Sequence, residues 1–318
     1  MKRALSPLVL VLLASCREPP APRPRAEPHV EAPPPPPSAS SAPVAPSIVA
    51  PSTTGARPAP SRESYPWLAD GVEPKPVTAL SSRIAPPPGF TRIPVEPGSF
   101  GAFLRDLPLA AEGTPVRAYD GRTLHPANDP RIAGVIALDV SPSDLQQCAD
   151  TVIRLNAEWR WSKGDRKMSY RAAAGIDLPW SRWAKGERIV PNGASISWAP
   201  SSRASEDHAS FRKYLDSVFA WANTVSLERQ SKKLKPEELR AGDFFILPGN
   251  PGHVVLVLDV ASRGEERVAL LGQSFMPAQN AQVLRPPDGG TWFRLDPTKD
   301  VDTPFWKPFP WSSLRRLE

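Results

Sequence analysis

The chain has 318 residues with a formal net charge of +6, and 42 of its residues are proline. Sixteen of these prolines fall within residues 1–60, which excludes a folded domain there, whereas all 10 Trp and 11 Phe follow and can form a core. Two cysteines exclude a disulfide framework, and four scattered histidines do not form a metal motif.

The ligand-binding motifs that are easiest to recognise are missing from the sequence. No glycine-rich phosphate loop of the P-loop or dinucleotide-binding type is present, so we expect neither a cofactor nor a metal. The basic residues are spread along the chain and form no long runs. This spread predicts a solvated basic surface and no nucleic-acid partner.

The first sixteen residues have the pattern of a lipoprotein signal. A basic start is followed by an apolar stretch over 4–14, which is long enough for a signal peptide and too short to span a bilayer. The stretch ends in Leu13-Ala14-Ser15-Cys16, which resembles the bacterial lipobox. We therefore expect residues 1–15 to be removed and Cys16 to carry lipid chains such as palmitate, which would anchor the protein to a membrane of the bacterial envelope. The alternative is an ordinary signal peptide with a coincidental cysteine.

A proline-rich tether follows the expected lipidation site. Residues 16–61 hold almost no large apolar side chain, which predicts a disordered linker with a reach on the order of 140 Å when fully extended. Such a linker would give the domain access to the cell wall, although a mere spacer has the same composition. Residues 62–87 are still proline-rich but carry Tyr65, Trp67 and Leu68, which predicts a lead-in that packs on the core.

The globular pattern begins at residue 88 and runs to the end of the chain. Residues 99–107 predict a short helix, and 115–119 and 134–139 predict short strands. Ser141 precedes a proline and, three residues later, an aspartate, which predicts the start of a helix that continues to about Trp159. Apolar residues at intervals of three and four place Cys148 on the buried face of this helix, in its second turn.

The second half of the chain changes from helical to strand periodicity. Helices are predicted at 206–221 and 226–233. Strands are predicted at 243–247, 253–258, 267–273 and 290–295, with a Pro-Gly turn joining the first two into a hairpin. Helices first and an antiparallel sheet second predict an α+β domain over 88–318.

Several blocks in this order resemble a known family. They are Pro88-Gly89-Phe90, Ser99-Phe100, Leu104-Arg105, Leu107-Pro108-Leu109, Asp144-Leu145-Gln146-Gln147-Cys148-Ala149-Asp150, Trp183-Ala184-Lys185-Gly186, Gly242-Asp243-Phe244-Phe245-Ile246, Pro251-Gly252-His253 and Gln273-Ser274-Phe275-Met276-Pro277-Ala278-Gln279. Over roughly 88–317 the chain is similar to the bacterial domain of unknown function 4846. That resemblance implies no established activity.

A more remote resemblance rests on about fifteen residues. Gln147-Cys148 and the stretch from Gly242 to Leu258 look like the core of the NlpC/P60 and CHAP amidases, which implies a papain-like core with helices packed on an antiparallel sheet. The chain lacks the Asp-Cys-Ser-Gly run of the NlpC/P60 enzymes. Cys148 and His253 are also 253 − 148 = 105 residues apart, which implies an insertion between helix and sheet.

These patterns predict a catalytic group of three residues. A thiol at a helix start and a nearby imidazole can form a nucleophile and its base, so we expect Cys148 as nucleophile and His253 as base. Gln273, at the end of an apolar strand, is expected to orient the ring, and Asp259 is a weaker candidate because about six residues of strand place it roughly 20 Å away. The expected reaction is hydrolysis of peptide amides, with peptidoglycan as one candidate substrate.

The alternative is a non-catalytic envelope binding or assembly domain. Free cysteines are usually small buried hydrophobic residues, and a single histidine at a strand start is often only a turn residue. A group of tryptophans could likewise line a sugar-binding cleft or form the core, and core packing is the more frequent arrangement. The group comprises Trp159, Trp161, Trp180, Trp183, Trp198 and Trp221.

Overall fold

The structure is a computed structural model, and it describes residues 60–68, 73–193 and 195–317. The expected signal peptide, the Cys16 lipidation site and nearly all of the proline-rich tether lie outside the described residues. The described residues belong to one unit that spans Gly55–Glu318. None of the helices described for this unit is long and apolar enough to cross a membrane.

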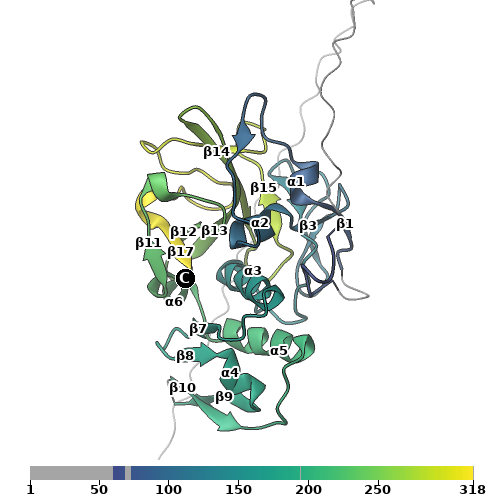
Figure 1. Cartoon of the computed structure of the whole chain (residues 1–318), viewed down its shortest axis with the longest axis vertical. Helices are drawn as coiled ribbons and strands as arrows, with labels where there is room; N and C mark the ends of the chain where they lie inside the picture. Colours follow the sequence, from purple (N-terminus) through teal and green to yellow (C-terminus); the bar gives the residue numbers. More distant parts are fainter. Residues whose placement is uncertain (1–59, 69–72, 194, 318) are drawn as a thin grey trace, which may run out of the picture. The chain divides into compact units, whose positions relative to one another are not determined.

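The α+β class predicted from the sequence is confirmed. A nine-stranded sheet forms the centre of the fold, in the order β11-β17-β12-β13-β14-β15-β6, with β16 paired to β14 and β2 paired to β13 (Figure 1). The neighbouring strands of this sheet are antiparallel. Its strands are β2 (Thr91–Arg92), β6 (Ile132–Val135), β11 (Ser231–Lys233), β12 (Phe244–Leu247), β13 (His253–Arg263), β14 (Glu266–Gln273), β15 (Gln282–Leu284), β16 (Phe293–Leu295) and β17 (Leu314–Leu317).

Helices and four small two-stranded sheets complete the described part of the chain. The small sheets pair β1 (Pro76–Ala79) with β3 (Pro108–Ala110), β4 (Val116–Arg117) with β5 (Thr123–His125), β7 (Ser169–Arg171) with β8 (Asp177–Pro179), and β9 (Glu187–Asn192) with β10 (Ser195–Pro200). The helices are α1 (Leu80–Arg83), α2 (Phe100–Arg105), α3 (Cys148–Ser162), α4 (Trp180–Ala184), α5 (His208–Phe219) and α6 (Thr224–Arg229), with 3-10 turns η1 (Pro236–Glu238) and η2 (Trp311–Ser313).

The predicted hairpin between the two buried strands is present. Leu247 at the end of β12 lies opposite His253 at the start of β13. Because strand side chains alternate between faces, Val254 and Leu256 join the hydrophobic cluster that includes helix α3, whereas Val255 belongs to the cluster on the other face. The sheet therefore has a core on each side, and α3 packs against β13 (Figure 1).

Helix α3 begins later than the sequence pattern predicted. The prediction of a start at Ser141 was wrong, because the first helical residue is Cys148 and the N-cap is Gln147. The backbone N–H of Gln147 donates to the Asp150 carboxylate at 3.1 Å, which completes a capping box. Cys148 consequently occupies the first turn and not the second. The apolar spacing over 145–159 correctly predicted a helix, but the predicted N-cap at Ser141 was wrong.

The interval between the cysteine helix and the main sheet holds a separate set of elements. Strands β7 to β10 and helices α4 and α5 fill most of it (Figure 1). Helix α5 starts after Asp207, whose side chain accepts from the Ser210 backbone N–H at 2.6 Å. The helix predicted over 226–233 corresponds to α6, which ends at Arg229, and the chain then forms strand β11 over Ser231–Lys233. Two of the four tryptophans of this region, Trp180 and Trp183, are buried in the core, whereas Trp198 and Trp221 are partly buried and pack against it.

The lead-in segment packs against the core. Tyr65 and Trp67 are each 3% exposed. The Tyr65 hydroxyl donates to the Phe103 carbonyl at 2.9 Å, and the Trp67 indole N–H donates to the Ala137 carbonyl at 2.7 Å. These bonds satisfy the polar tips of two large side chains, so residues 60–68 are held onto the domain at its edge.

Candidate functional site

Cys148 is the first residue of helix α3 and is almost fully buried. Its thiol donates weakly to the Gly252 carbonyl oxygen at 3.9 Å. Burial, followed by the nearby Asp150 carboxyl, raises the pKa of the thiol to about 12, although backbone N–H groups at Ala149 and Val254 act in the opposite direction. The thiol of this structure is therefore neutral at physiological pH.

His253 is the first residue of strand β13 and has no exposed surface. Its Nε2 lies 2.7 Å from Oε1 of Gln273. Because that oxygen can only accept, Nε2 carries the proton and Nδ1 carries the lone pair. Nδ1 is buried and has no hydrogen-bond partner. Burial lowers the pKa of the ring to about 4, so the imidazole is neutral.

Gln273, predicted as the residue that orients the ring, contacts it from the end of strand β14. Strands β13 and β14 are antiparallel neighbours, with Leu256 opposite Gly272, and this pairing brings His253 and Gln273 to the same end of the sheet. Asp259 lies elsewhere. Its carboxylate is 2.7 Å from Arg92 Nε and 2.6 Å from Arg105 Nη2.

The Cys148 thiol reaches the backbone next to His253, but the two side chains are not hydrogen-bonded to each other. The thiol contacts the carbonyl of Gly252, the residue immediately before His253. Within the described residues, no hydrogen bond joins the Cys148 thiol to the His253 ring. The ring packs instead beside Phe275 and Trp306, with centroid distances of 4.8 and 5.0 Å. The assignment of Cys148, His253 and Gln273 as catalytic residues stays a prediction.

A pocket of about 320 Å³ opens beside the thiol. Its walls come from the start of α3, the end of α5, the start of α6 and the β12–β13 turn. Cys148 lines this pocket, whereas His253 does not. Its acidic lining residues are Asp144 and Asp150, and no cationic side chain joins them.

Asp150 is a feature of the site that sequence reasoning missed. One carboxylate oxygen accepts from the Gln147 backbone N–H, and the other is buried without a partner. Burial raises the pKa of this carboxyl to about 8. Its position in the sequence could have predicted this role. Asp150 follows Cys148 by two residues, and an acidic residue at the third position of a helix that starts at the cysteine can cap that helix.

A buried polar network fixes the residues immediately before Cys148. The Arg154 guanidinium, which is fully buried, donates to Asp139 at 2.7 Å, to Gln146 at 2.9 Å and to Glu158 at 2.8 Å. The Gln146 amide also donates to the Asp139 carbonyl at 3.1 Å. These bonds hold the loop that leads into α3, so they determine where the thiol sits.

The loop between Val301 and Phe309 covers the His253 ring. Its two ends are joined by reciprocal backbone hydrogen bonds of 2.8 and 2.9 Å. Phe305 in this loop has a φ of 75°, a left-handed value that is uncommon for a bulky residue. The indole N–H of the neighbouring Trp306 is buried without a partner. The loop therefore seals the imidazole from solvent at a local energetic cost.

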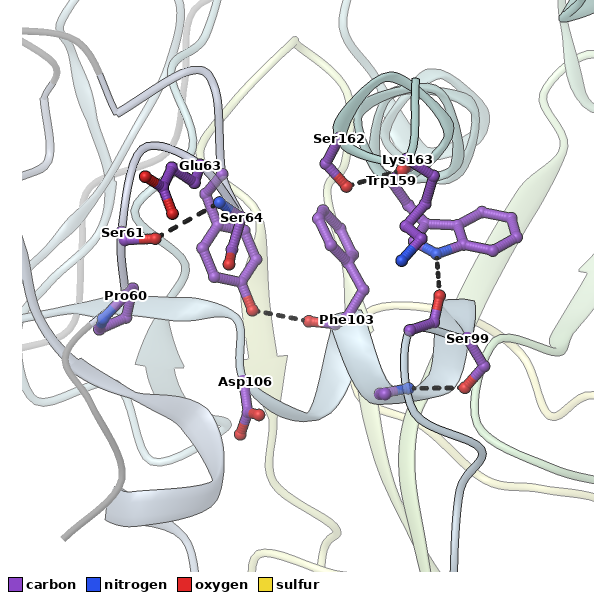
Figure 2. Close-up of a pocket in the computed structure, with 13 residues that line it drawn as sticks. Pro60, Ser61, Glu63, Ser64, Ser99, Phe103, Asp106, Trp159, Ser162 and Lys163 are labelled. Atoms are coloured by element: carbon purple, nitrogen blue, oxygen red, sulfur yellow. Dashed lines mark hydrogen bonds between the residues drawn. The ribbon is translucent and has the colours of Figure 1, made fainter. Parts of the chain in front are cut away.

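The largest of the described pockets lies away from these residues. It measures about 550 Å³ and is formed by the lead-in segment, helix α2 and the last turn of α3. Figure 2 shows Pro60 to Ser64 on one side of it, Trp159 to Lys163 on the other, and the Phe103 ring between them. Within the described residues, no group of three or more His, Cys, Asp or Glu side chains could hold a metal ion.

The fold and this site describe an α+β domain with a buried cysteine at a helix start and a histidine–glutamine pair on the adjoining sheet. The chain belongs to the family described as domain of unknown function (4846), whose match covers residues 80–316. This membership confirms the family resemblance read from the sequence. Neither a curated protein nor a solved structure matches the chain.

Proposed function

We propose that the chain is a lipid-anchored protein of the bacterial envelope whose domain is a cysteine hydrolase of peptide amides. In this proposal Cys148 is the nucleophile, His253 is the base and Gln273 orients the ring. The observation that carries it is the buried, unpartnered Nδ1 of His253, whose other nitrogen is already held by Gln273 at 2.7 Å. An unpaired polar atom in a core is costly, and a role in proton transfer explains why it is kept.

The proposed reaction uses the thiol and this free nitrogen in turn. Sγ leaves its contact with the Gly252 carbonyl and approaches Nδ1, which takes the thiol proton. Sulfur then forms a bond to the substrate carbonyl carbon, the C–N bond breaks, and the imidazolium returns the proton to the leaving amine. Water hydrolyses the resulting thioester and regenerates the thiol. Backbone N–H groups at the start of α3 are available to the oxyanion.

We further propose that the core is papain-like. Three features support it: the helix begins at the cysteine, that helix packs against an antiparallel sheet, and the histidine begins a central strand of the sheet. The elements between α3 and β12 then correspond to the insertion that the 105-residue spacing implied.

The envelope location and the lipid anchor rest on the first sixteen residues. The apolar stretch followed by Leu13-Ala14-Ser15-Cys16 supports export and acylation at Cys16. The test is growth with labelled palmitate, followed by separation of membrane and soluble fractions. Wild-type protein should be labelled and found with membranes, whereas Cys16→Ser should carry no label; label on both would refute acylation at this cysteine.

A second candidate, a non-catalytic binding or assembly domain of the envelope, is favoured by the burial of both groups. A thiol with a pKa of about 12 and an imidazole with a pKa of about 4 are both neutral at pH 7, which leaves no thiolate–imidazolium pair. In this case the His253–Gln273 bond is a structural element of the core.

The two candidates are separated by incubating purified Cys16→Ser protein with peptidoglycan fragments and identifying released peptides by mass spectrometry. The hydrolase predicts peptides that Cys148→Ala and His253→Asn no longer release. Equal product from the Cys148→Ala variant would eliminate the proposed nucleophile. Retention of the protein on intact cell walls, equal in all variants and without any peptide release, would establish the binding domain.

A further inference from the structure

Trp159 occupies an unusual position among the tryptophans of the domain. It is partly exposed, and it lines three of the described pockets, which measure about 550, 280 and 430 Å³. The two smaller pockets share Asn156, Arg240, Arg316 and Leu317 in addition to Trp159. The indole thus stands between the large pocket on one side and a pair of overlapping pockets on the other.

The orientation of the indole is fixed by the protein. Its N–H donates to the Gly98 carbonyl at 2.9 Å (Figure 2). Its ring packs against Phe100 with a centroid distance of 5.4 Å and an interplanar angle of 37°. Because the only polar atom of the side chain is already bonded, what the indole can offer a ligand is its aromatic surface.

Different charged side chains line the pockets on the two sides of Trp159. Lys163 lines the large pocket. Arg240 lines both smaller pockets, which also carry other cations, Arg316 among them, and the carboxylates of Glu96, Asp165 and Asp243. The Lys163 and Arg240 side chains are both exposed, and no salt bridge within the described residues involves either of them. The large pocket also carries the carboxylates of Glu63 and Asp106 (Figure 2). We refer to the three pockets that share Trp159 together as the groove, and a ligand that spans them would meet Lys163, the indole and Arg240.

We propose that this groove binds an acidic glycan chain, with one sugar ring stacked on Trp159 and carboxylates directed to Lys163 and Arg240. The C–H face of a sugar carries partial positive charge and suits the negative face of an indole. Guanidinium and ammonium groups bind carboxylates by charge-assisted hydrogen bonds. Glu63 and Asp106 can accept hydrogen bonds from sugar hydroxyls.

The same combination of aromatic and basic side chains also occurs in proteins that bind single-stranded nucleic acid. One observation favours the glycan. The other two large aromatic side chains of the large pocket, Tyr65 and Phe103, are 3% and 8% exposed, which leaves a single stacking surface there, whereas successive bases would need several.

The proposal does not depend on Cys148 being a nucleophile. Its test is a binding titration of Cys16→Ser protein, followed by tryptophan fluorescence, with a peptide-free oligosaccharide of alternating N-acetylglucosamine and N-acetylmuramic acid. An N-acetylglucosamine oligomer of equal length is the uncharged comparison. A single-stranded oligonucleotide and an acidic peptide of similar charge are the competing ligand classes.

The acidic oligosaccharide should bind about tenfold more tightly than the neutral one. Arg240→Gln should remove most of that difference and leave affinity for the neutral oligomer unchanged. Trp159→Leu should weaken both by about tenfold or more, while Trp221→Leu, at a partly exposed tryptophan outside the described pockets, should have no effect. The matched charge control is Arg294→Gln, whose side chain is 75% exposed.

Three results would overturn the proposal. They are equal affinity of wild type and Arg240→Gln for the acidic oligosaccharide, tighter binding of the oligonucleotide or the peptide, and an affinity unchanged in Trp159→Leu. Thermal unfolding of each variant separates a lost binding site from a lost fold, and Arg240→Gln provides the test if Trp159→Leu proves unstable. Because Cys148→Ala should bind the oligosaccharide like wild type, failure of the hydrolase proposal and failure of this one are distinguishable.

Discussion

The imidazole Nε2 of His253 lies 2.7 Å from the amide oxygen of Gln273, and this contact joins the first residue of β13 to the last residue of β14. The bond selects the tautomer in which Nε2 is protonated. It leaves Nδ1 as the atom with a free lone pair, which is the arrangement a base needs. The effect of the His253–Gln273 pair on the pKa of the ring and on the stability of the domain can be measured directly.

Changing the partner of the ring should move the pKa of His253 in a predictable direction. In Gln273→Glu a carboxylate would replace the amide, so the pKa should rise from about 4 by one unit or more. In Gln273→Leu the bond that raises the pKa is lost, so the pKa should fall further. The measurement is an NMR titration of the imidazole nitrogens. A pKa that is the same in all three proteins would show that Gln273 does not contact the ring.

His253 should make the stability of the domain dependent on pH below neutrality. Its pKa is lowered from 6.5 to about 4 by burial, so the unfolded chain binds more protons between these values. Its contribution is complete above pH 6.5 and is lost as the pH falls toward 4, by about 3 kcal/mol in the free energy of unfolding.

The measurement of this effect must allow for Asp150. Its pKa is raised to about 8, so its contribution to stability changes with pH in the opposite direction. That carboxyl is stabilised in the folded protein by protonation, so its contribution increases as the pH falls from 8. The effect of His253 is obtained from the difference between wild type and His253→Asn in urea unfolding at pH 7 and pH 4.5. Wild type should lose more stability than the variant over this range, and parallel losses would contradict the lowered pKa.

Asp150 should also control the reactivity of the thiol. Burial is the larger cause of the raised Cys148 pKa and Asp150 is the second, so Asp150→Asn should lower the pKa below about 12 while leaving it above the usual 9.0. The asparagine oxygen can still accept from the Gln147 N–H, which preserves the cap.

Iodoacetamide labelling of the Cys16→Ser protein against pH measures this pKa. The Asp150→Asn variant should react faster than the parent at every pH between 8 and 10. Asp144→Asn is the matched control, since Asp144 lines the same pocket but is not a cause of the shift. Equal acceleration in both variants would mean that the pocket, and not Asp150, limits access to the thiol.

The parts of the site that the sequence predicted are those encoded by local patterns. The alternation of apolar residues and a Pro-Gly turn was enough to pair β12 with β13, and an antiparallel third strand then brought Gln273 to His253. The start of α3 was missed because Ser141 and the following proline have a strong local capping pattern, whereas the observed cap pairs Gln147 with Asp150, which is a weaker pattern in the sequence.

The loop that covers the His253 ring could not be predicted from the sequence, because its contacts join residues that are distant in the chain. Trp306 and His253 are brought together by a loop whose ends, Val301 and Phe309, are bonded to each other. No periodic pattern marks this loop, and its prolines predict only irregular chain. The prediction that residues 62–87 pack on the core could be made because large aromatic side chains rarely stay in solvent, and Tyr65 and Trp67 are buried.

The polar network behind the thiol should be a major determinant of stability. Arg154→Met removes a fully buried guanidinium and leaves Glu158, which is also fully buried, with His208 as its remaining bonded partner at 2.9 Å. Leaving a buried carboxylate without its guanidinium partner should cost about 3–5 kcal/mol of unfolding free energy.

The same helix offers the control for this change. Arg160 pairs with Asp165 at 2.7 Å, but both side chains are partly exposed, so Arg160→Met should cost less than about 1 kcal/mol. Urea unfolding followed by tryptophan fluorescence measures both variants. Because Arg154 also holds Gln146, which precedes the cap of α3, the Arg154→Met protein should label faster at Cys148 than the Arg160→Met protein in native buffer. Equal stability losses in the two variants would contradict the cost of the unpartnered Glu158 carboxylate, and equal labelling rates would show that the buried network does not fix the start of α3.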